Sequence, residues 1–215
     1  MKIAQNLQTL RAEIPEGVSL VAVSKTKLEA DLLEAYQAGQ RIFGENKIQE
    51  MCQKWEQLPK DIQWHMIGHV QTNKVKYMAP FVDLVHGVDR LKLLKEIDKQ
   101  AAKYQRTIRC LLQVHIAQES TKFGLSATEL QEILAAKASF AHVELCGLMG
   151  MATFTDNRAQ IEDEFKYLQS LFEEHRAQHP ELQILSMGMS GDYALAIACG
   201  STMIRVGSKI FGARQ

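Results

Sequence analysis

The chain has 215 residues, a length typical of one domain and sufficient to bury a sizeable core. Lysine and arginine together number 25, and aspartate and glutamate also number 25, so the formal net charge is zero. Without a strong positive field the chain is not expected to bind nucleic acid or an anionic membrane surface, and a small-molecule partner is favoured.

The N-terminal segment, residues 1–16, alternates charged and apolar residues. It lacks the unbroken apolar stretch of a signal peptide and the roughly 20 apolar residues of a membrane span. We therefore expect a cytoplasmic protein. The four cysteines are far apart and form no CxxC pair, which predicts buried thiols rather than a zinc cage or a disulfide framework; they are Cys52, Cys110, Cys146 and Cys199.

A leading helix is predicted over residues 1–12, and after it short apolar runs alternate with helical patterns. Such alternation is typical of parallel βαβ units, and nearly continuous hydrophobicity is typical of strands buried on both faces. One helical pattern, with apolar residues three and four apart, covers residues 91–101. The predicted strands are Ser19–Val23, Arg41–Phe43, Gln63–Ile67, Leu84–Val88, Arg109–Ile116, Val143–Gly147, Ile184–Met187 and Met203–Val206.

Eight strand-and-helix units with no linker between them predict a single (β/α)8 TIM barrel over residues 1–215, although about 250 residues is the usual size. An open doubly wound sheet is the alternative. A barrel places its functional groups just after the strands, at their carboxyl ends.

Lys25 stands at such a position, directly after the predicted first strand and Ser24. Burial disfavours the charged form of a lysine, and the neutral amine can attack an aldehyde to form a Schiff base. A single lysine at a strand end is more often one that extends into solvent, so this residue alone is a weak signal.

The loops after the seventh and eighth predicted strands carry features of a phosphate site. Residues 186–192 are rich in serine and glycine and lead into a predicted helix over residues 193–199, while Gly207 and Ser208 follow Arg205 at the end of the last strand. Free N–H groups and a hydroxyl at a helix start favour an anion, and barrels of this kind often bind phosphate there. Ordinary turn glycines and a capping serine are the alternative for each loop. In a closed barrel these loops adjoin Lys25, and a phosphate site beside an amine calls for a phosphorylated aldehyde.

The chain resembles the YggS/PROSC family of pyridoxal-phosphate homeostasis proteins, whose barrel is similar to the N-terminal domain of alanine racemase. The resemblance runs along almost the whole chain. It is carried by the segments 22–25 (AVSK), 43–46 (FGEN), 65–74 (HMIGHVQTNK), 119–124 (ESTKFG), 147–149 (GLM), 186–190 (SMGMS) and 200–207 (GSTMIRVG).

By this resemblance pyridoxal 5′-phosphate is the cofactor and Lys25 is its Schiff-base lysine. Ser190, Gly207 and Ser208 would lie at the phosphate, Arg205 would face the pyridine nitrogen, and Asn46 would be near the cofactor. A permanently charged guanidinium beside the ring nitrogen suppresses its protonation and makes the ring a weaker electron sink.

Two positions depart from the family pattern, and no family role is carried onto them. His115 stands where asparagine is expected, and Gly87 follows His86 where serine is frequent. A catalytic metal held by histidines is disfavoured, because the His-x-His pair of metal-dependent hydrolases is absent. The run 148–151, rich in methionine, is predicted to be barrel core.

The function expected from these patterns is that of a monomeric carrier or reservoir of pyridoxal phosphate, with apo-enzymes as candidate partners. The alternatives are an amino-acid racemase or decarboxylase on the same scaffold, or a phosphate-sugar aldolase that uses Lys25. Racemisation needs acid and base groups on both faces of the cofactor. Related racemases take the second group from a later domain and a partner, whereas this chain ends ten residues after Arg205, so we expect one face of the ring to be open to solvent.

Overall fold

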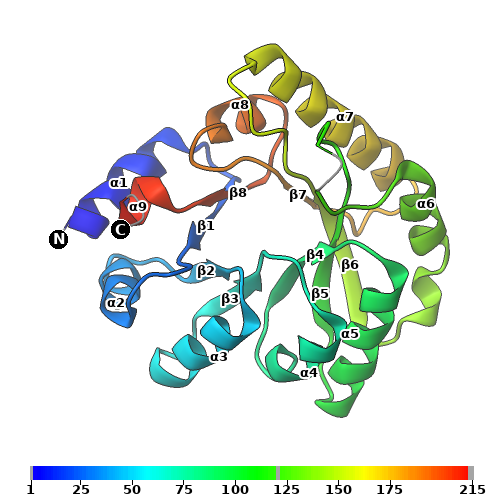
Figure 1. Ribbon diagram of the computed structural model, residues 1–215, viewed down its shortest axis with the longest axis horizontal. Helices are drawn as coiled ribbons and strands as arrows, with labels where there is room; N and C mark the ends of the chain where they lie inside the picture. The colour runs from blue at the N-terminus through cyan, green and yellow to red at the C-terminus, as the bar shows by residue number, and fades with distance from the viewer. Residues whose placement is uncertain (1, 120–121, 213–215) are drawn as a thin grey trace.

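The structure, a computed structural model, describes residues 2–119 and 122–212. Within these residues eight parallel strands pair in chain order and close into a barrel, because the first strand also pairs with the last. Figure 1 shows the strands surrounded by helices. The strands are β1 (Ser19–Val23), β2 (Ile42–Glu45), β3 (Gln63–Met66), β4 (Leu84–Val88), β5 (Ile108–Gln113), β6 (Val143–Met149), β7 (Ile184–Ser186) and β8 (Met203–Val206). The predicted barrel is confirmed.

Helices follow the strands along the chain and cover the outside of the barrel. The α-helices are α1 (Lys2–Glu13), α2 (Glu29–Gln37), α3 (Ile48–Gln57), α4 (Val75–Met78), α5 (Leu91–Lys103), α6 (Ala127–Ala135), α7 (Arg158–Arg176), α8 (Tyr193–Ala198) and α9 (Ser208–Phe211), with short 3-10 helices η1 (Thr72–Lys74) and η2 (Lys137–Ser139). Among the described residues no helix is both long and apolar enough to cross a membrane.

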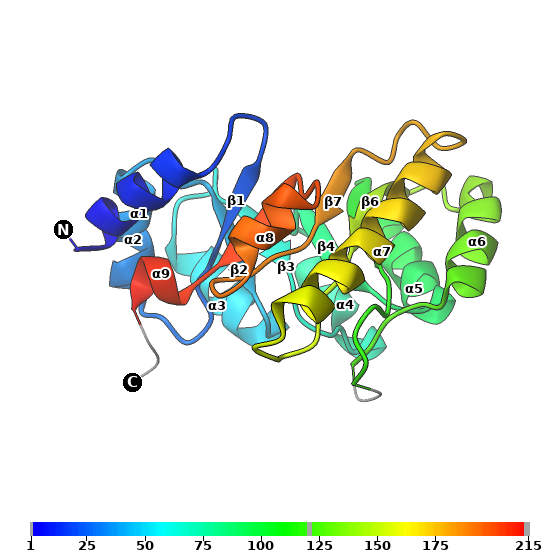
Figure 2. The ribbon, with the colours of Figure 1, turned by 90° about the horizontal axis from the view of Figure 1, so that it is seen from above.

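Helix α1 precedes the barrel and packs beside α2 and α9, so the two ends of the described chain lie side by side (Figures 1 and 2). The Asn6 side-chain amide donates to the Ile210 carbonyl at 2.9 Å across this contact. The contact joins the elements that flank β1 and β8, the pair of strands that closes the barrel.

The predicted ends of β1, β4 and β8 agree with the structure, whereas β2 runs to Glu45 rather than ending at Phe43. Glycine and glutamate are poor strand formers, but both are buried here. A Cβ on Gly44 would lie 2.9 Å from Val21 Cγ1, so the glycine makes room for a neighbouring strand.

The other strands differ from the prediction mainly at their carboxyl ends. β3 and β7 stop one residue early, a difference within the ordinary uncertainty of element ends. β5 ends at Gln113 rather than Ile116. The Val114 amide still donates to the Met149 carbonyl at 2.9 Å, but Val114 is paired with Leu125 in an isolated bridge. β6 continues to Met149 rather than stopping at Gly147, because its last two residues still pair with β5.

The hydrophobic core has two layers. The outer layer lies between strands and helices and contains large buried side chains such as Trp64, Phe43 and Phe165, each worth about 2–3 kcal/mol on burial. The inner layer fills the barrel and consists of Val21, Leu84, Leu111, Cys146, Met149 and Met203. Cys110, Cys146 and Cys199 are buried thiols as predicted, whereas Cys52 is only half-buried.

Candidate functional site

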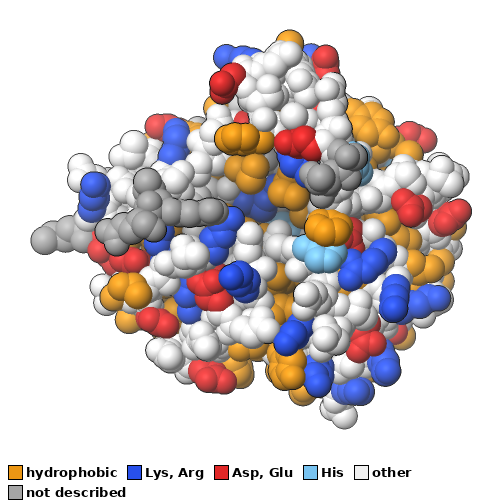
Figure 3. All heavy atoms as spheres, viewed as in Figure 1, with side chains coloured by type: hydrophobic (Ala, Val, Ile, Leu, Met, Phe, Trp, Pro, Cys, Tyr) orange, Lys and Arg blue, Asp and Glu red, His pale blue; other side chains and the backbone are white. Residues whose placement is uncertain are grey.

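A cavity of about 600 Å³ opens at the carboxyl ends of the strands. Basic and hydrophobic side chains gather around the hollow of the face seen in Figure 3. All six residues singled out by the sequence analysis line this cavity: Lys25, Asn46, Ser190, Arg205, Gly207 and Ser208. The barrel therefore brings together groups that are up to 183 positions apart in the sequence.

Lys25 lies in a turn two residues beyond the end of β1 and is half-buried. The turn is fixed by backbone bonds from the Ser24 amide to the Gly44 carbonyl at 3.0 Å and from the Lys27 amide to the Ser24 carbonyl at 3.1 Å. Thr26 has a φ of 63°, a left-handed conformation that is rare for a β-branched residue. The backbone on the carboxyl side of Lys25 is thus held in a strained conformation.

Ion pairs of Lys54 with Glu45 and Glu50 fix the turn that contains Lys25. The Lys54 ammonium donates to the Ser24 carbonyl at 2.7 Å and to one oxygen each of Glu45 and Glu50 at 2.8 Å. Glu45 also accepts from the Ser24 hydroxyl at 2.6 Å, and Glu50 accepts from the Thr26 amide at 2.5 Å. The residues immediately before and after Lys25 are therefore both tied to the same cluster.

The cluster is expensive to bury. Glu45 is fully buried and Lys54 is 3% exposed. Loss of hydration raises the pKa of Glu45, an effect that the nearby Lys54 opposes. The second carboxylate oxygen, Oε2, has no hydrogen-bond partner among the described residues. Removal of Lys54 would leave a buried carboxylate without its cation, which is far more costly than loss of a surface pair.

The loop between β7 and α8 forms one wall of the cavity. Gly188 has a φ of +96°, and a Cβ there would lie 2.6 Å from the Ala196 Cβ, so this position requires glycine. The Met189 amide donates to the Asp192 carboxylate at 2.5 Å and tightens the loop. Burial raises the pKa of Asp192. The loop thereby presents Ser190 at the cavity surface.

Ser190 contacts Gly207, the residue that precedes α9. Its hydroxyl oxygen accepts a hydrogen bond of 3.2 Å from the Gly207 amide, which links the β7–α8 loop to the end of β8. A Cβ on Gly207 would lie 3.1 Å from the Val23 carbonyl oxygen. The Gly207 amide is thus occupied by Ser190, but the first turn of a helix leaves further amide groups without intrahelical partners, so Gly207 and Ser208 lie where an anion can be bound.

Arg205 lies at the floor of the cavity and is 4% exposed. One terminal nitrogen donates to the carbonyl and the hydroxyl of Ser186 at 2.9 and 2.6 Å, and the other donates to the Gly150 carbonyl at 3.0 Å. Burial lowers the pKa of the Arg205 guanidinium to about 10, so it is still protonated at neutral pH. The cavity therefore has a fixed positive charge at its base.

Asn46 follows β2 and lies beside a close backbone contact. A Cβ on Gly68 would lie 2.4 Å from the Asn46 carbonyl oxygen, so the loops after β2 and β3 touch only because Gly68 lacks a side chain. Gly87 has a similar role, because its Cβ would lie 2.7 Å from the Gly68 carbonyl. A serine would not fit at position 87 in this structure without movement of the neighbouring backbone. The other departure, His115, places its Nε2 3.1 Å from the Glu119 carbonyl oxygen.

The loop after β6 forms a further wall of the cavity that was not predicted from the sequence. This wall includes Met151, Thr153 and the 94% exposed Phe154. In the run predicted to be core, Leu148 and Met149 are fully buried, but Met151 is only half-buried and also lines the cavity. No local pattern distinguishes this loop from an ordinary connection.

Lys122 also lines the cavity and contacts this wall, because its ammonium donates to the Ala152 carbonyl at 2.5 Å. Part of the motif 119–124 lies outside the described residues, namely positions 120 and 121. No group of three or more His, Cys, Asp or Glu side chains suited to a metal ion occurs in the part of the chain that the structure describes.

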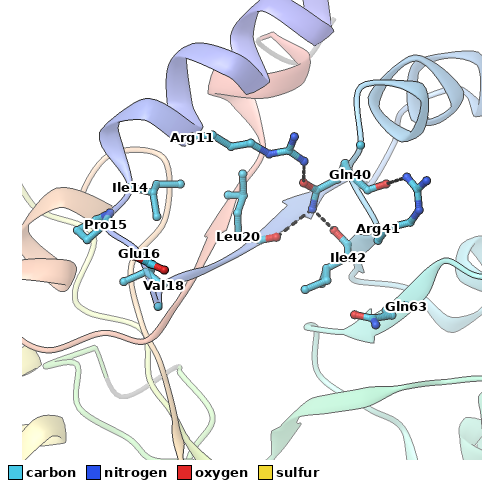
Figure 4. Close-up of a pocket in the computed structure, with 12 residues that line it drawn as sticks. Arg11, Ile14, Pro15, Glu16, Val18, Leu20, Gln40, Arg41, Ile42 and Gln63 are labelled. Atoms are coloured by element: carbon cyan, nitrogen blue, oxygen red, sulfur yellow. Dashed lines mark hydrogen bonds between the residues drawn. The ribbon is translucent and has the colours of Figure 1, made fainter.

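A second cavity, of about 390 Å³, lies at the opposite end of the barrel below β1 and β2 (Figure 4). The Gln40 side-chain amide bridges the Leu20 and Ile42 carbonyls at 2.9 and 2.7 Å, and Arg11 donates to Gln40 at 3.0 Å. These groups are used in binding β1 to β2, which pair at only two positions. The polar groups of this cavity therefore stabilise the contact between β1 and β2.

The whole chain, residues 1–215, matches the family described as alanine racemase, N-terminal domain. It is 40% identical over 222 residues to the pyridoxal phosphate homeostasis protein of Pasteurella multocida, covering 100% of this chain and 95% of that protein. The structure of PipY from Synechococcus elongatus with PLP bound is 37% identical, with a TM-score of 0.90, covering 98% of this chain and 100% of PipY. Alanine racemase from Bartonella henselae shares the fold at 17% identity and a TM-score of 0.74; the match covers 99% of this chain and 58% of the racemase.

Proposed function

The chain belongs to the pyridoxal phosphate homeostasis proteins, within the alanine racemase N-terminal domain family, and from this membership we propose that it binds pyridoxal 5′-phosphate and carries or buffers it. The ligand would occupy the cavity at the carboxyl ends of the strands. The proposal rests on one observation. The same cavity is lined by the Lys25 amine, by the buried Arg205 guanidinium and by serine and glycine residues that can bind an anion.

The residues of the cavity fit this ligand. Ser190, Gly207 and Ser208 would hold the phosphate, because they combine a hydroxyl with amides at a helix start. Glycine at position 207 also lets the end of β8 lie close to β1, because a Cβ there would be 3.1 Å from the Val23 carbonyl oxygen. Lys25 would supply the amine that condenses with the aldehyde and releases water.

Pyridoxal phosphate supplies an aldehyde that reacts with amines and a ring that can withdraw electrons. Arg205 would face the ring nitrogen. A guanidinium is a donor only and cannot accept a proton, so Arg205 would keep the ring nitrogen unprotonated and limit electron withdrawal. Asn46 would lie beside the ring, where its amide can donate or accept. This arrangement favours retention of the ligand over general amino-acid chemistry.

The shape of the cavity supports a carrier. Phe154 stands almost fully exposed on one wall, and Met189 and Lys25 are each only partly buried. A site that excluded water would enclose such groups. A carrier of this kind would act as a monomer in the cytoplasm and deliver its ligand to apo-enzymes.

The test is a transfer experiment with protein loaded with pyridoxal phosphate. We expect one equivalent to bind by absorption titration, and an added apo-enzyme that needs this cofactor to regain activity. Common amino acids should show no racemisation, decarboxylation or transamination. Lys25-dependent exchange of an amino acid's α-proton coupled to racemisation would instead assign the protein as a racemase.

A further inference from the structure

A line of polar side chains runs through the barrel interior from the cavity floor. The Arg205 guanidinium lies 2.6 Å from the Ser186 hydroxyl, which lies 3.2 Å from His86 Nδ1. His86 Nε2 lies 3.0 Å from His65 Nδ1, and His65 Nε2 lies 3.4 Å from an Asp83 carboxylate oxygen. The first four residues are at most 4% exposed, whereas Asp83 is 34% exposed and precedes β4 at the opposite end of the barrel.

The chemistry of these groups sets the direction of every hydrogen bond. Arginine only donates, so the Ser186 oxygen accepts from Arg205 and its proton is available for His86 Nδ1. A neutral imidazole has one donor and one acceptor nitrogen, so His86 then donates from Nε2 to His65 Nδ1. The Nε2–H of His65 then faces the Asp83 carboxylate oxygen, 3.4 Å away.

Burial supports neutral rings at both histidines. It lowers the pKa of His65 and lowers the pKa of His86 well below its ordinary value, and the positive charge of Arg205 lowers the pKa of His86 further. A protonated His65 would reverse the contact between the rings, because both of its nitrogens would then donate. The protonation state of His65 therefore decides the tautomer of His86. The His86 proton lies on Nε2 if His65 is neutral and on Nδ1 if His65 is protonated.

We propose that Ser186, His86, His65 and Asp83 form a one-way hydrogen-bond relay that positions Arg205 from the opposite end of the barrel. In this relay the Ser186 hydroxyl donates its hydrogen to His86 Nδ1, and the Ser186 oxygen accepts a hydrogen bond from the Arg205 guanidinium. With its second nitrogen on Gly150, Arg205 is held with its remaining edge at the cavity floor. The consequence for pyridoxal phosphate rests on the proposed function, but the relay itself does not.

Asp83, the last member of the relay, does not fill the barrel interior, because its side chain is 34% exposed. The surrounding interior is apolar and includes Leu84, on the same strand as His86, and Leu111 on the neighbouring β5. Buried imidazoles contribute less to stability than well-packed apolar groups unless each nitrogen is hydrogen-bonded. Changes at Asp83 should therefore act on Arg205 through the intervening side chains rather than through packing.

The first arm of the test uses ligand-free protein and nitrogen-15 NMR of the histidine rings. We expect His65 and His86 to be neutral at neutral pH, with the proton on Nε2 of each ring. A proton on His86 Nδ1, or a charged His65, would overturn the relay. This arm is independent of whether pyridoxal phosphate binds.

The second arm follows hydrogen exchange of the Arg205 guanidinium in two variants. Ser186→Ala removes the first link but keeps the Ser186 backbone carbonyl, and Asp83→Ala removes the last link far from the cavity. Both should speed exchange about threefold or more and mix the histidine tautomers, as expected for loss of one hydrogen bond in a coupled set. Cys146→Ala, which changes the same interior layer outside the relay, is the control.

The third arm uses the loaded protein. Asp83→Ala should weaken binding of pyridoxal phosphate about threefold or more and change the visible absorption of the bound ligand, while Cys146→Ala should do neither. If the histidine tautomers, the hydrogen-exchange rate of Arg205 and the absorption of the bound ligand are all unchanged in Asp83→Ala, the relay is wrong. If the unmodified protein binds no pyridoxal phosphate, the proposed function fails while the first two arms still decide the relay.

Discussion

Individual side chains in the cavity depend on partners that lie outside it. Lys25 is held through the backbone of its two neighbours, which are tied to Lys54, Glu45 and Glu50. The sequence singled out Lys25 by its place after an apolar run. It gave no sign of Lys54, whose partner Glu45 is nine positions earlier on a different element.

Lys54→Met should lower the free energy of unfolding by about 3–5 kcal/mol at neutral pH, because the buried Glu45 would lose its cation. Burial already raises the pKa of Glu45, and loss of Lys54 would raise it further. Since protonation of Glu45 removes the uncompensated charge, the variant should recover part of this loss as the pH falls through the raised pKa. Denaturant unfolding at several pH values measures both effects.

The double variant Lys54→Met with Glu45→Gln is the matched control. It removes both charges, so its stability should depend less on acid pH than that of Lys54→Met and should be higher at neutral pH. Equal stability of the two variants at neutral pH would show that the cluster is not electrostatically coupled.

Arg205→Glu should favour a protonated ring nitrogen in bound pyridoxal phosphate, because a carboxylate would replace the guanidinium. Arg205→Ala should weaken retention of the ligand by removing a fixed buried positive charge. The visible spectrum of the loaded variants as a function of pH measures the first effect, and equilibrium dialysis the second. Spectra and affinities unchanged in both variants would exclude Arg205 from the pyridine ring.

The secondary-structure elements show which local patterns are reliable. Mostly apolar runs predicted the observed ends of β1, β4 and β8, because both faces of these strands are covered, although β4 contains His86 and β8 contains Arg205. β2 was predicted too short, because Gly44 and Glu45 are favourable in a strand only through tertiary contacts. The loop after β6 was missed as a cavity wall, because Met151 and Phe154 acquire that role only when the barrel closes.

Two glycines in the β7–α8 loop, Gly188 and Gly191, provide a matched pair of substitutions. Gly188→Ala should lower the free energy of unfolding by about 2–4 kcal/mol and weaken ligand binding, because the new Cβ would clash with Ala196 at a positive φ. Gly191→Ala in the same loop should be nearly neutral for stability, since a Cβ there meets no atom within 4 Å. Thermal unfolding of the pair measures the difference, and similar losses in both variants would contradict this explanation.

At the scale of the whole molecule, closure of the barrel creates the site. β1 pairs with β8 so that Val21 lies opposite Arg205 and Ala22 opposite Val206, which brings Lys25 beside Gly207. The fold class and the place of the cavity could be predicted from the sequence, because eight βα units and strand-end residues are local features. The buried cluster behind Lys25 and the polar line through the interior could not, because they join side chains from several strands across the core.

The proposed function requires that pyridoxal phosphate is held covalently by Lys25. The most direct measurement is borohydride reduction of the loaded protein followed by digestion and mass mapping of the labelled peptide. We expect a single label on Lys25, loss of the label and of the visible absorption in Lys25→Ala with the fold intact, and retention of both in Lys27→Ala. A label on Lys122 or Lys74, or an undiminished label in Lys25→Ala, would contradict it.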